Sequence, residues 1–153
     1  MNMPYIRQQT QYQMSSAYQN IHQFLNQLLQ AAASEAQAID FYTRVVQSAP
    51  NEKAREDFNH ALEDERLHYR LFVDLYRRIT SQEPQVPSFT PVTFNSFGEA
   101  LNKAVESELE AYEMYRNMYL STFDPAARDI LLRAFTDEME HATRFVNQKV
   151  MQR

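Results

Sequence analysis

The chain of 153 residues contains no cysteine and only one glycine, Gly98. Without cysteine there can be no disulfide, zinc ribbon, rubredoxin-type iron site or thiol catalysis within this sequence. A single glycine also excludes the glycine-rich phosphate loops of Rossmann and P-loop proteins. The scarcity of glycine favours long helices joined by few tight turns.

Charge and hydropathy exclude further classes of protein. The formal net charge is -5 and the basic residues form no extended patch, so nucleic acid is not an expected partner. No apolar run approaches the ~20 residues that a membrane span requires. The stretch from Met1 to Gln13 is polar and Gln-rich and lacks the apolar segment of a secretory signal. We therefore expect a cytoplasmic protein with one domain and a sizeable core.

Apolar residues recur at helical spacing in four segments, which predicts an all-α fold. We expect helices over about 16–48 and 51–80, a third from Ser96 and a fourth from Asp124-Pro125. Pro50 separates the first two helices, and so short a link predicts an antiparallel hairpin. Residues 16–150 would form the four-helix bundle, preceded by a flexible Gln-rich arm at residues 1–15.

A proline-containing segment, residues 81–95, separates the two predicted hairpins. Fifteen extended residues reach roughly 50 Å, whereas a 30-residue helix is about 45 Å long. The segment can therefore run the whole length of the bundle. This predicts a four-helix bundle with one long crossover between its second and third helices.

The most informative pattern is an internal repeat that relates the first half of the chain to the second at a constant offset. Two Glu-x-x-His motifs occur, and each is preceded at the same distance by another glutamate in the same helical register. Ser34-Glu35-x-x-Ala38-x-x-x-Tyr42 also recurs as Ser107-Glu108-x-x-Ala111-x-x-x-Tyr115. Residues three apart on a helix project from one face. The six candidate metal ligands are Glu35, Glu65, His68, Glu108, Glu138 and His141.

These six side chains fall on the apolar stripes that should face the core. Four buried carboxylates would be very costly without a counter-charge, and two divalent cations supply it. We expect Glu65 and Glu138 to bridge the metals, with Glu35 and Glu108 each binding one. Mixed oxygen and imidazole donors suit iron or manganese better than calcium, magnesium or structural zinc. The competing interpretation, a solvated helix face with intrahelical polar pairs, explains a single motif better than a doubled one.

Tyr42 and Tyr115 lie two turns beyond Glu35 and Glu108 on the same helix faces. They are candidate catalytic residues, which would hydrogen-bond a ligand carboxylate or pass an electron. Two ordinary core tyrosines would fit the same pattern, and both alternatives stay open.

Four further residues lie outside this set of ligands and tyrosines. Asp64 and Asp137 each precede a histidine by four residues, and either orient imidazoles, such as those of the opposite hairpin, or contact solvent. His22 and His60 lie outside the repeat and the apolar stripes, so we expect both on the surface.

Residues 16 to 150 resemble the ferritin-like superfamily, nearest to rubrerythrin and bacterioferritin. The stretch from Asp137 to Ala142 is close to a bacterioferritin-type ligand motif, and Glu35 to Tyr42 resembles that family's first helix. The resemblance implies a ferritin-like antiparallel four-helix bundle that holds two iron ions, or alternatively two manganese or mixed metals.

Departures from these families limit the expected function. Rubrerythrins carry an extra glutamate where this chain has Ala111, which argues against a rubrerythrin-type peroxidase. Arg66 stands where bacterioferritin has its haem methionine, so no haem is expected. The fifth helix of cage-forming ferritins is missing, and a homodimer is expected instead of a cage.

Three functions are compatible with this sequence. The first is a di-iron oxidoreductase that reduces dioxygen or hydrogen peroxide, oxidises ferrous ion, or does both, with an electron donor that the sequence does not identify. The second is a di-manganese enzyme of the catalase type. The third is a non-enzymatic metal-binding or structural protein, for which the Gln-rich arm hints at assembly.

Overall fold

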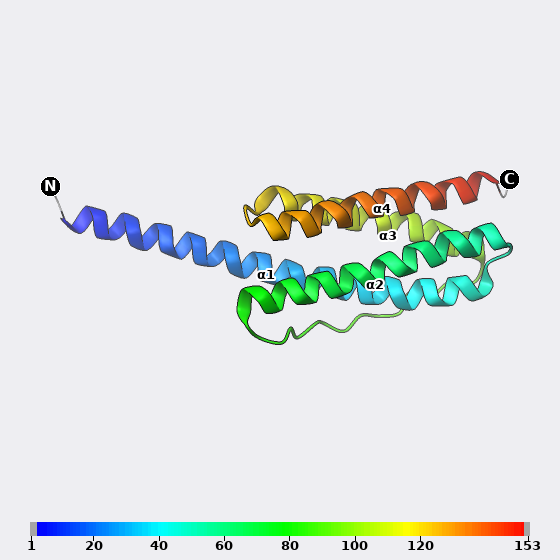
Figure 1. Cartoon of the computed structure of the whole chain (residues 1–153), viewed down its shortest axis with the longest axis horizontal. Helices are drawn as coiled ribbons and strands as arrows, with labels where there is room; N and C mark the ends of the chain where they lie inside the picture. The colour runs from blue at the N-terminus through cyan, green and yellow to red at the C-terminus, as the bar shows by residue number, and fades with distance from the viewer. Residues whose placement is uncertain (1–2, 152–153) are drawn as a thin grey trace.

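A computed structural model describes the backbone of residues 3–151 and the side chains of residues 20–151. Four helices make up the fold, as Figure 1 shows: α1 (Met3–Ser48), α2 (Glu52–Thr80), α3 (Phe97–Ser121) and α4 (Pro125–Met151). The predicted all-α bundle is confirmed. Within the described residues, no helix is long and apolar enough to cross a membrane.

Side-chain caps start three of the helices where the sequence predicts them. Asn51 accepts a hydrogen bond of 2.9 Å from the backbone N–H of Ala54, and Asp124 accepts one of 2.7 Å from Ala127. Ser96 caps α3 through the N–H of Glu99 at 3.2 Å. Each cap satisfies a backbone donor that the first helical turn leaves unpaired.

Helix α1 begins earlier than the sequence indicates. The predicted start near Ser16 is wrong, because the helix already begins at Met3. Its N-terminal part projects well beyond the ends of the other three helices (Figure 1). The flexible arm at residues 1–15 stays a prediction.

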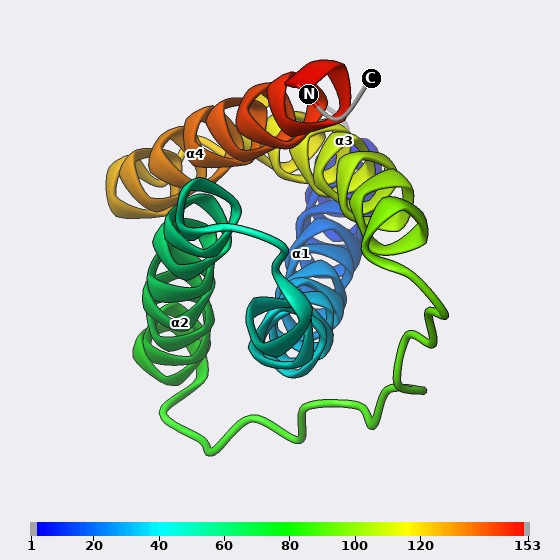
Figure 2. The same cartoon turned by 90° about the vertical axis from the view of Figure 1, so that its right-hand side faces the viewer.

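The helices surround a common axis, which Figure 2 shows nearly end-on. Helix α1 packs against α2 and α3, and α4 packs against the same two helices. The segment between α2 and α3 runs back along the outside of α1, as the predicted crossover requires (Figure 2). Gln37 of α1 holds it by a hydrogen bond of 2.7 Å to the carbonyl of Thr90, and Phe94 packs on Phe41. The fold is ferritin-like, with its one long crossover between α2 and α3.

Two apolar clusters form the core, and the repeat relates one to the other. One cluster contains Leu28, Phe72 and Tyr115. The other contains their repeat-related counterparts, Leu101, Phe145 and Tyr42. The polar residues of the repeat belong to neither cluster, and these residues form the candidate site.

Candidate metal centre

Each helix contributes one carboxylate to a common cluster, and α2 and α4 each add a histidine. All six residues are buried, with at most 2% of the surface of each residue exposed. They are Glu35 from α1, Glu65 and His68 from α2, Glu108 from α3, and Glu138 and His141 from α4. The structure therefore brings together every residue that the sequence proposes as a ligand.

Three carboxylates surround Nδ1 of His68. Oε2 of Glu65 lies 3.2 Å from this nitrogen, Oε1 of Glu138 lies 3.3 Å from it, and Oε1 of Glu35 lies 3.7 Å from it. One nitrogen and three carboxylates thus converge on a space of the size that a single metal ion occupies.

The same arrangement occurs around Nδ1 of His141. Oε1 of Glu65 lies 3.3 Å from this nitrogen, Oε2 of Glu138 lies 3.2 Å from it, and Oε2 of Glu108 lies 3.5 Å from it. Both groups can hold a metal ion, since their ligand atoms lie within 4.8 Å of one another. Glu65 and Glu138 belong to both groups, and each turns one oxygen toward each histidine.

The polar groups of this cluster are not satisfied by the protein alone. Oε1 of Glu138 is buried without a hydrogen-bond partner, although Nδ1 of His68 lies only 3.3 Å away. A buried carboxylate oxygen without a partner costs about 1–3 kcal/mol or more. Two divalent cations bound between the histidines and carboxylates would satisfy this oxygen and balance four carboxylates. The donor set therefore fits a dinuclear centre.

Burial and the closeness of the charges shift the pKa values of the groups in this cluster. Burial, and next the neighbouring carboxylates of α2 and α4, raise the pKa of Glu35 and Glu108 well above the usual value. Burial opposes the charged form of Glu65, but hydrogen bonds with His141 and His68 outweigh it and hold its pKa at about 2. Burial also opposes charge on both imidazoles, yet hydrogen bonds to carboxylates raise the pKa of His68 and His141. The raised pKa values favour protonated forms, and these protons offset negative charge that bound metal ions would otherwise neutralise.

The outer nitrogen of each histidine pairs with an aspartate on the facing helix. Nε2 of His68 lies 3.0 Å from Oδ2 of Asp137, and Nε2 of His141 lies 3.1 Å from Oδ2 of Asp64. Of the two alternatives for these aspartates, the structure favours orientation of an imidazole on the opposite hairpin. Such a partner fixes the tautomer and leaves Nδ1 free to bind a metal.

Both tyrosines of the repeat contact a glutamate of the other hairpin. The hydroxyl of Tyr42 donates to Oε1 of Glu108, and that of Tyr115 donates to Oε1 of Glu35 at 2.6 Å. Burial and the adjacent carboxylates raise the pKa of both phenols, so both retain their protons at neutral pH. Of the two alternatives for these tyrosines, the geometry favours hydrogen bonding to the proposed ligands. Electron transfer by the phenols stays a prediction.

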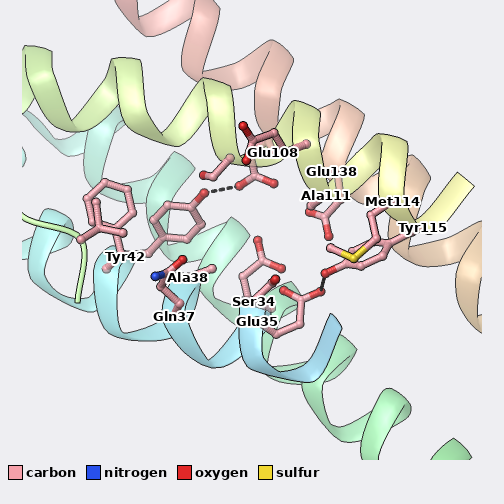
Figure 3. A pocket seen from close by; sticks show the side chains of 15 residues that line it. Ser34, Glu35, Gln37, Ala38, Tyr42, Glu108, Ala111, Met114, Tyr115 and Glu138 are labelled. Atoms are coloured by element: carbon pink, nitrogen blue, oxygen red, sulfur yellow. Dashed lines mark hydrogen bonds between the residues drawn. The ribbon is translucent and has the colours of Figure 1, made fainter. Parts of the chain in front are cut away.

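A small cavity between α1 and α3 reaches the cluster, and Figure 3 shows the side chains that line it. Its volume is about 110 Å³. Pairs of residues related by the repeat line it, including Ala38 with Ala111 and Ser34 with Ser107. A water molecule needs about 10–15 Å³ of such volume, so the cavity has room for several water molecules or a small reactant.

The sequence does not anticipate the position of His60. Its side chain is half-exposed, as expected for a surface residue, but it lies 3.4 Å from Oδ2 of Asp64. Through Asp64 it connects to the candidate centre at His141. The spacing of His60 and Asp64, four residues apart on α2, is visible in the sequence, but only the packing of α2 on α4 brings them to His141. His22, the other histidine expected on the surface, is exposed.

The rubrerythrin family model matches residues 26–149, a range that contains all six candidate ligands. The chain belongs to the rubrerythrin family. Its buried clusters of glutamate and histidine are typical of a dinuclear metal site in this family. No cysteine is present in the 153 residues, so this rubrerythrin-family domain lacks a rubredoxin-type iron site.

One sequence relative and two solved structures are similar to this chain. The Bacillus subtilis protein YhjR is 28% identical over 122 residues, which cover 80% of this chain and 83% of YhjR. The Mycobacterium tuberculosis protein Rv2844 shares the fold with a TM-score of 0.71 and 20% identity, over 82% of this chain and 96% of Rv2844.

The second structure is a two-domain protein from Anabaena variabilis with DJ-1/ThiJ/PfpI-like and ferritin-like domains. It matches with a TM-score of 0.70 and 14% identity, over 84% of this chain. The present chain spans only 36% of that protein. At this level of identity, the likeness to both structures establishes the fold alone.

Proposed function

We propose that this rubrerythrin-family protein is a di-iron oxidoreductase that reduces dioxygen or hydrogen peroxide, with ferrous ion as the source of electrons. The observation that carries the proposal is the pair of mirrored donor groups that share Glu65 and Glu138. Two adjacent metal ions can supply two electrons in one encounter, which is the number that reduces hydrogen peroxide to water.

The donor atoms are compatible with iron as the metal and also with manganese. Each group offers one imidazole and three carboxylates, and such mixed oxygen and nitrogen sets suit iron and manganese. Metal analysis of the protein purified from its native host distinguishes the two. Iron as the predominant metal supports the proposal, whereas manganese would favour the catalase-type alternative.

The cavity supports a small oxidant as the substrate. Its volume of about 110 Å³ and its lining by Ala38 and Ala111 are sufficient for a diatomic molecule or a peroxide. Tyr42 and Tyr115 line the same cavity and keep their protons at neutral pH. They orient Glu108 and Glu35 by hydrogen bonds close to the place where an oxidant would enter.

Stopped-flow mixing of the ferrous-loaded protein with each oxidant tests the proposal. We expect the absorption of oxidised iron protein to develop faster than free ferrous ion oxidises under the same conditions. Because Ala111 replaces a glutamate of rubrerythrins, we expect dioxygen to react at least as fast as peroxide. The variant Glu65→Ala should lose the reaction, and Glu113→Ala, an exposed change on α3, should retain it. If iron in the protein oxidised no faster than free ferrous ion with either oxidant, the enzymatic proposal would fail and a non-enzymatic role would be favoured.

We further propose that the protein is a homodimer. A groove lined by Ile21, Phe24, Ile79 and Phe123 lies near the point where α1 leaves the bundle, and 92% of the Phe123 side chain is exposed. A second copy of the chain would cover these apolar groups. Light scattering should give the mass of a dimer; a monomer or a cage-sized particle would refute this proposal.

A further inference from the structure

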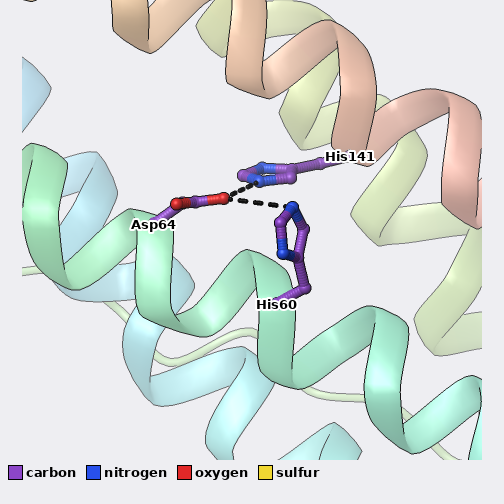
Figure 4. A group of neighbouring side chains, drawn as sticks. All are labelled: His60, Asp64 and His141. Carbon is purple, nitrogen blue, oxygen red and sulfur yellow. Dashed lines mark hydrogen bonds and ion pairs between the residues drawn. The ribbon is translucent and has the colours of Figure 1, made fainter.

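A second group of metal-binding side chains lies outside the centre, on the face shared by α2 and α4. Nε2 of His60 is 3.4 Å from Oδ2 of Asp64 and 3.4 Å from Oε1 of Glu140. Figure 4 shows how His60 and Asp64 from α2 meet His141 from α4. The mechanism proposed above uses neither His60 nor Glu140.

His141 lies between this group and the inner centre, and both of its ring nitrogens already have partners. Nδ1 faces the carboxylates of the centre, and Nε2 hydrogen-bonds to Asp64. Neither nitrogen is therefore left for a metal on the surface. Asp64 has a second oxygen, and a carboxylate accepts several interactions at once. The donors available to a surface cation are thus His60, Asp64 and Glu140.

Solvent reaches these three side chains, whose exposed fractions are 42%, 25% and 49% for His60, Asp64 and Glu140. Arg144 also pairs with Glu140, at 2.6 Å. The same guanidinium contacts the buried Asp57 at 3.0 Å. Arg144 therefore keeps an ionic partner if a cation draws Glu140 away.

The internal repeat is broken at this group. The repeat-related positions of His60 and Glu140 are Arg133 and Leu67. An arginine repels a cation and a leucine offers no donor atom, so the face around Asp137 cannot build the same group. The two inner positions are nearly equivalent, but among the side chains that the structure describes (residues 20–151) a group of this kind lies outside the position at His141 alone.

We propose that His60, Asp64 and Glu140 form a third, solvent-accessible site for a first-row divalent metal such as ferrous ion, from which the inner position at His141 is filled. Three protein donors leave the remaining coordination to water, so this site binds more weakly than the inner ones. An imidazole with two carboxylates suits the same ions as the centre. The loading role rests on the proposed dinuclear centre, whereas binding at the surface does not.

Calorimetric titration of the metal-free protein with Co²⁺ tests the binding. We expect three equivalents per chain, of which the third is the weakest. His60→Ala and Glu140→Gln should each lose the weak equivalent and retain two. Arg133→Ala is the matched control, because it changes the repeat-related position, and it should retain three. Two equivalents in the unaltered protein, or three in His60→Ala, would overturn the proposal. If the unaltered protein bound only the weak equivalent and lacked the two tight ones, the dinuclear centre would be contradicted instead.

The rate at which the centre fills tests the loading role. Co²⁺ bound by the buried imidazoles and carboxylates can be followed by its visible absorption after rapid mixing. We expect His60→Ala to fill more slowly than Arg133→Ala, while both reach the same final absorption. Equal rates in the two variants would exclude the loading role.

Discussion

The hydroxyl of Tyr115 lies 2.6 Å from Oε1 of Glu35, although 80 residues separate the two in the sequence. The bond joins the two hairpins beside the candidate centre, and Tyr42 makes the equivalent bond to Glu108. Each tyrosine therefore orients a glutamate that lies on a different helix.

Replacing Tyr115 by Phe should weaken metal binding without unfolding the bundle. The ring packing on Phe72 stays, but Glu35 loses the donor that orients it. Partners of this kind typically change metal affinity by about 10–100-fold. Titration with Co²⁺ measures the change, with Tyr119→Phe, outside the cavity lining, as control. An affinity equal to that of the control would show that Tyr115 is an ordinary core residue.

Replacing Glu65 or Glu138 by Ala should abolish tight binding of both metals, because each carboxylate belongs to both donor groups. Replacing Glu35 by Ala should affect mainly the position at His68, since Glu35 belongs to that group alone. Metal analysis after dialysis gives the number of ions retained. One tightly held ion in Glu65→Ala would contradict the bridging role.

Metal binding should release protons and should strengthen as the pH rises. The pKa values of Glu35, Glu108, His68 and His141 are all raised, so these groups hold their protons to a higher pH than they would in water. Metal ligands must be deprotonated, so each bound ion displaces protons. Calorimetry in buffers of different ionisation enthalpy measures the number released. The same heat in every buffer would contradict this charge state of the metal-free cluster.

Asp57 should stabilise the bundle at neutral pH and lose this effect in acid. Its carboxylate is buried, and hydrogen bonds with Lys53, Gln148 and Arg144 outweigh burial and lower its pKa below the usual 3.8. A lowered pKa contributes stability that is present above about pH 4 and is lost as the pH falls through the folded-state value.

We expect Asp57→Asn to reduce the free energy of unfolding at pH 7 by about 1.5–3 kcal/mol, the range for hydrogen bonds to charged groups. Urea denaturation at pH 7 and at pH 3 should show the difference shrinking in acid. Asp129→Asn, at an exposed position of α4, provides the control. A difference that stays constant down to pH 3 would contradict the assignment.

Much of the fold follows from patterns that are local in the sequence. The helices, their caps at Asn51, Ser96 and Asp124, and the length of the crossover are all set by residues within a turn or two of one another. The repeat adds one long-range fact, that Glu35 and Glu108 occupy equivalent places. Helical periodicity then places all six candidate ligands toward the core, because side chains three or four apart share a face.

Contacts between helices have no such local signature. The extension of α1 to Met3 is not predictable in this way, because its Gln-rich beginning shows no clear apolar stripe. The pairing of His68 with Asp137, and of His60 with Glu140, depends on how α2 and α4 are rotated and offset against each other. Side-chain packing along the whole length of both helices determines that geometry, so these contacts emerge only once the bundle is assembled.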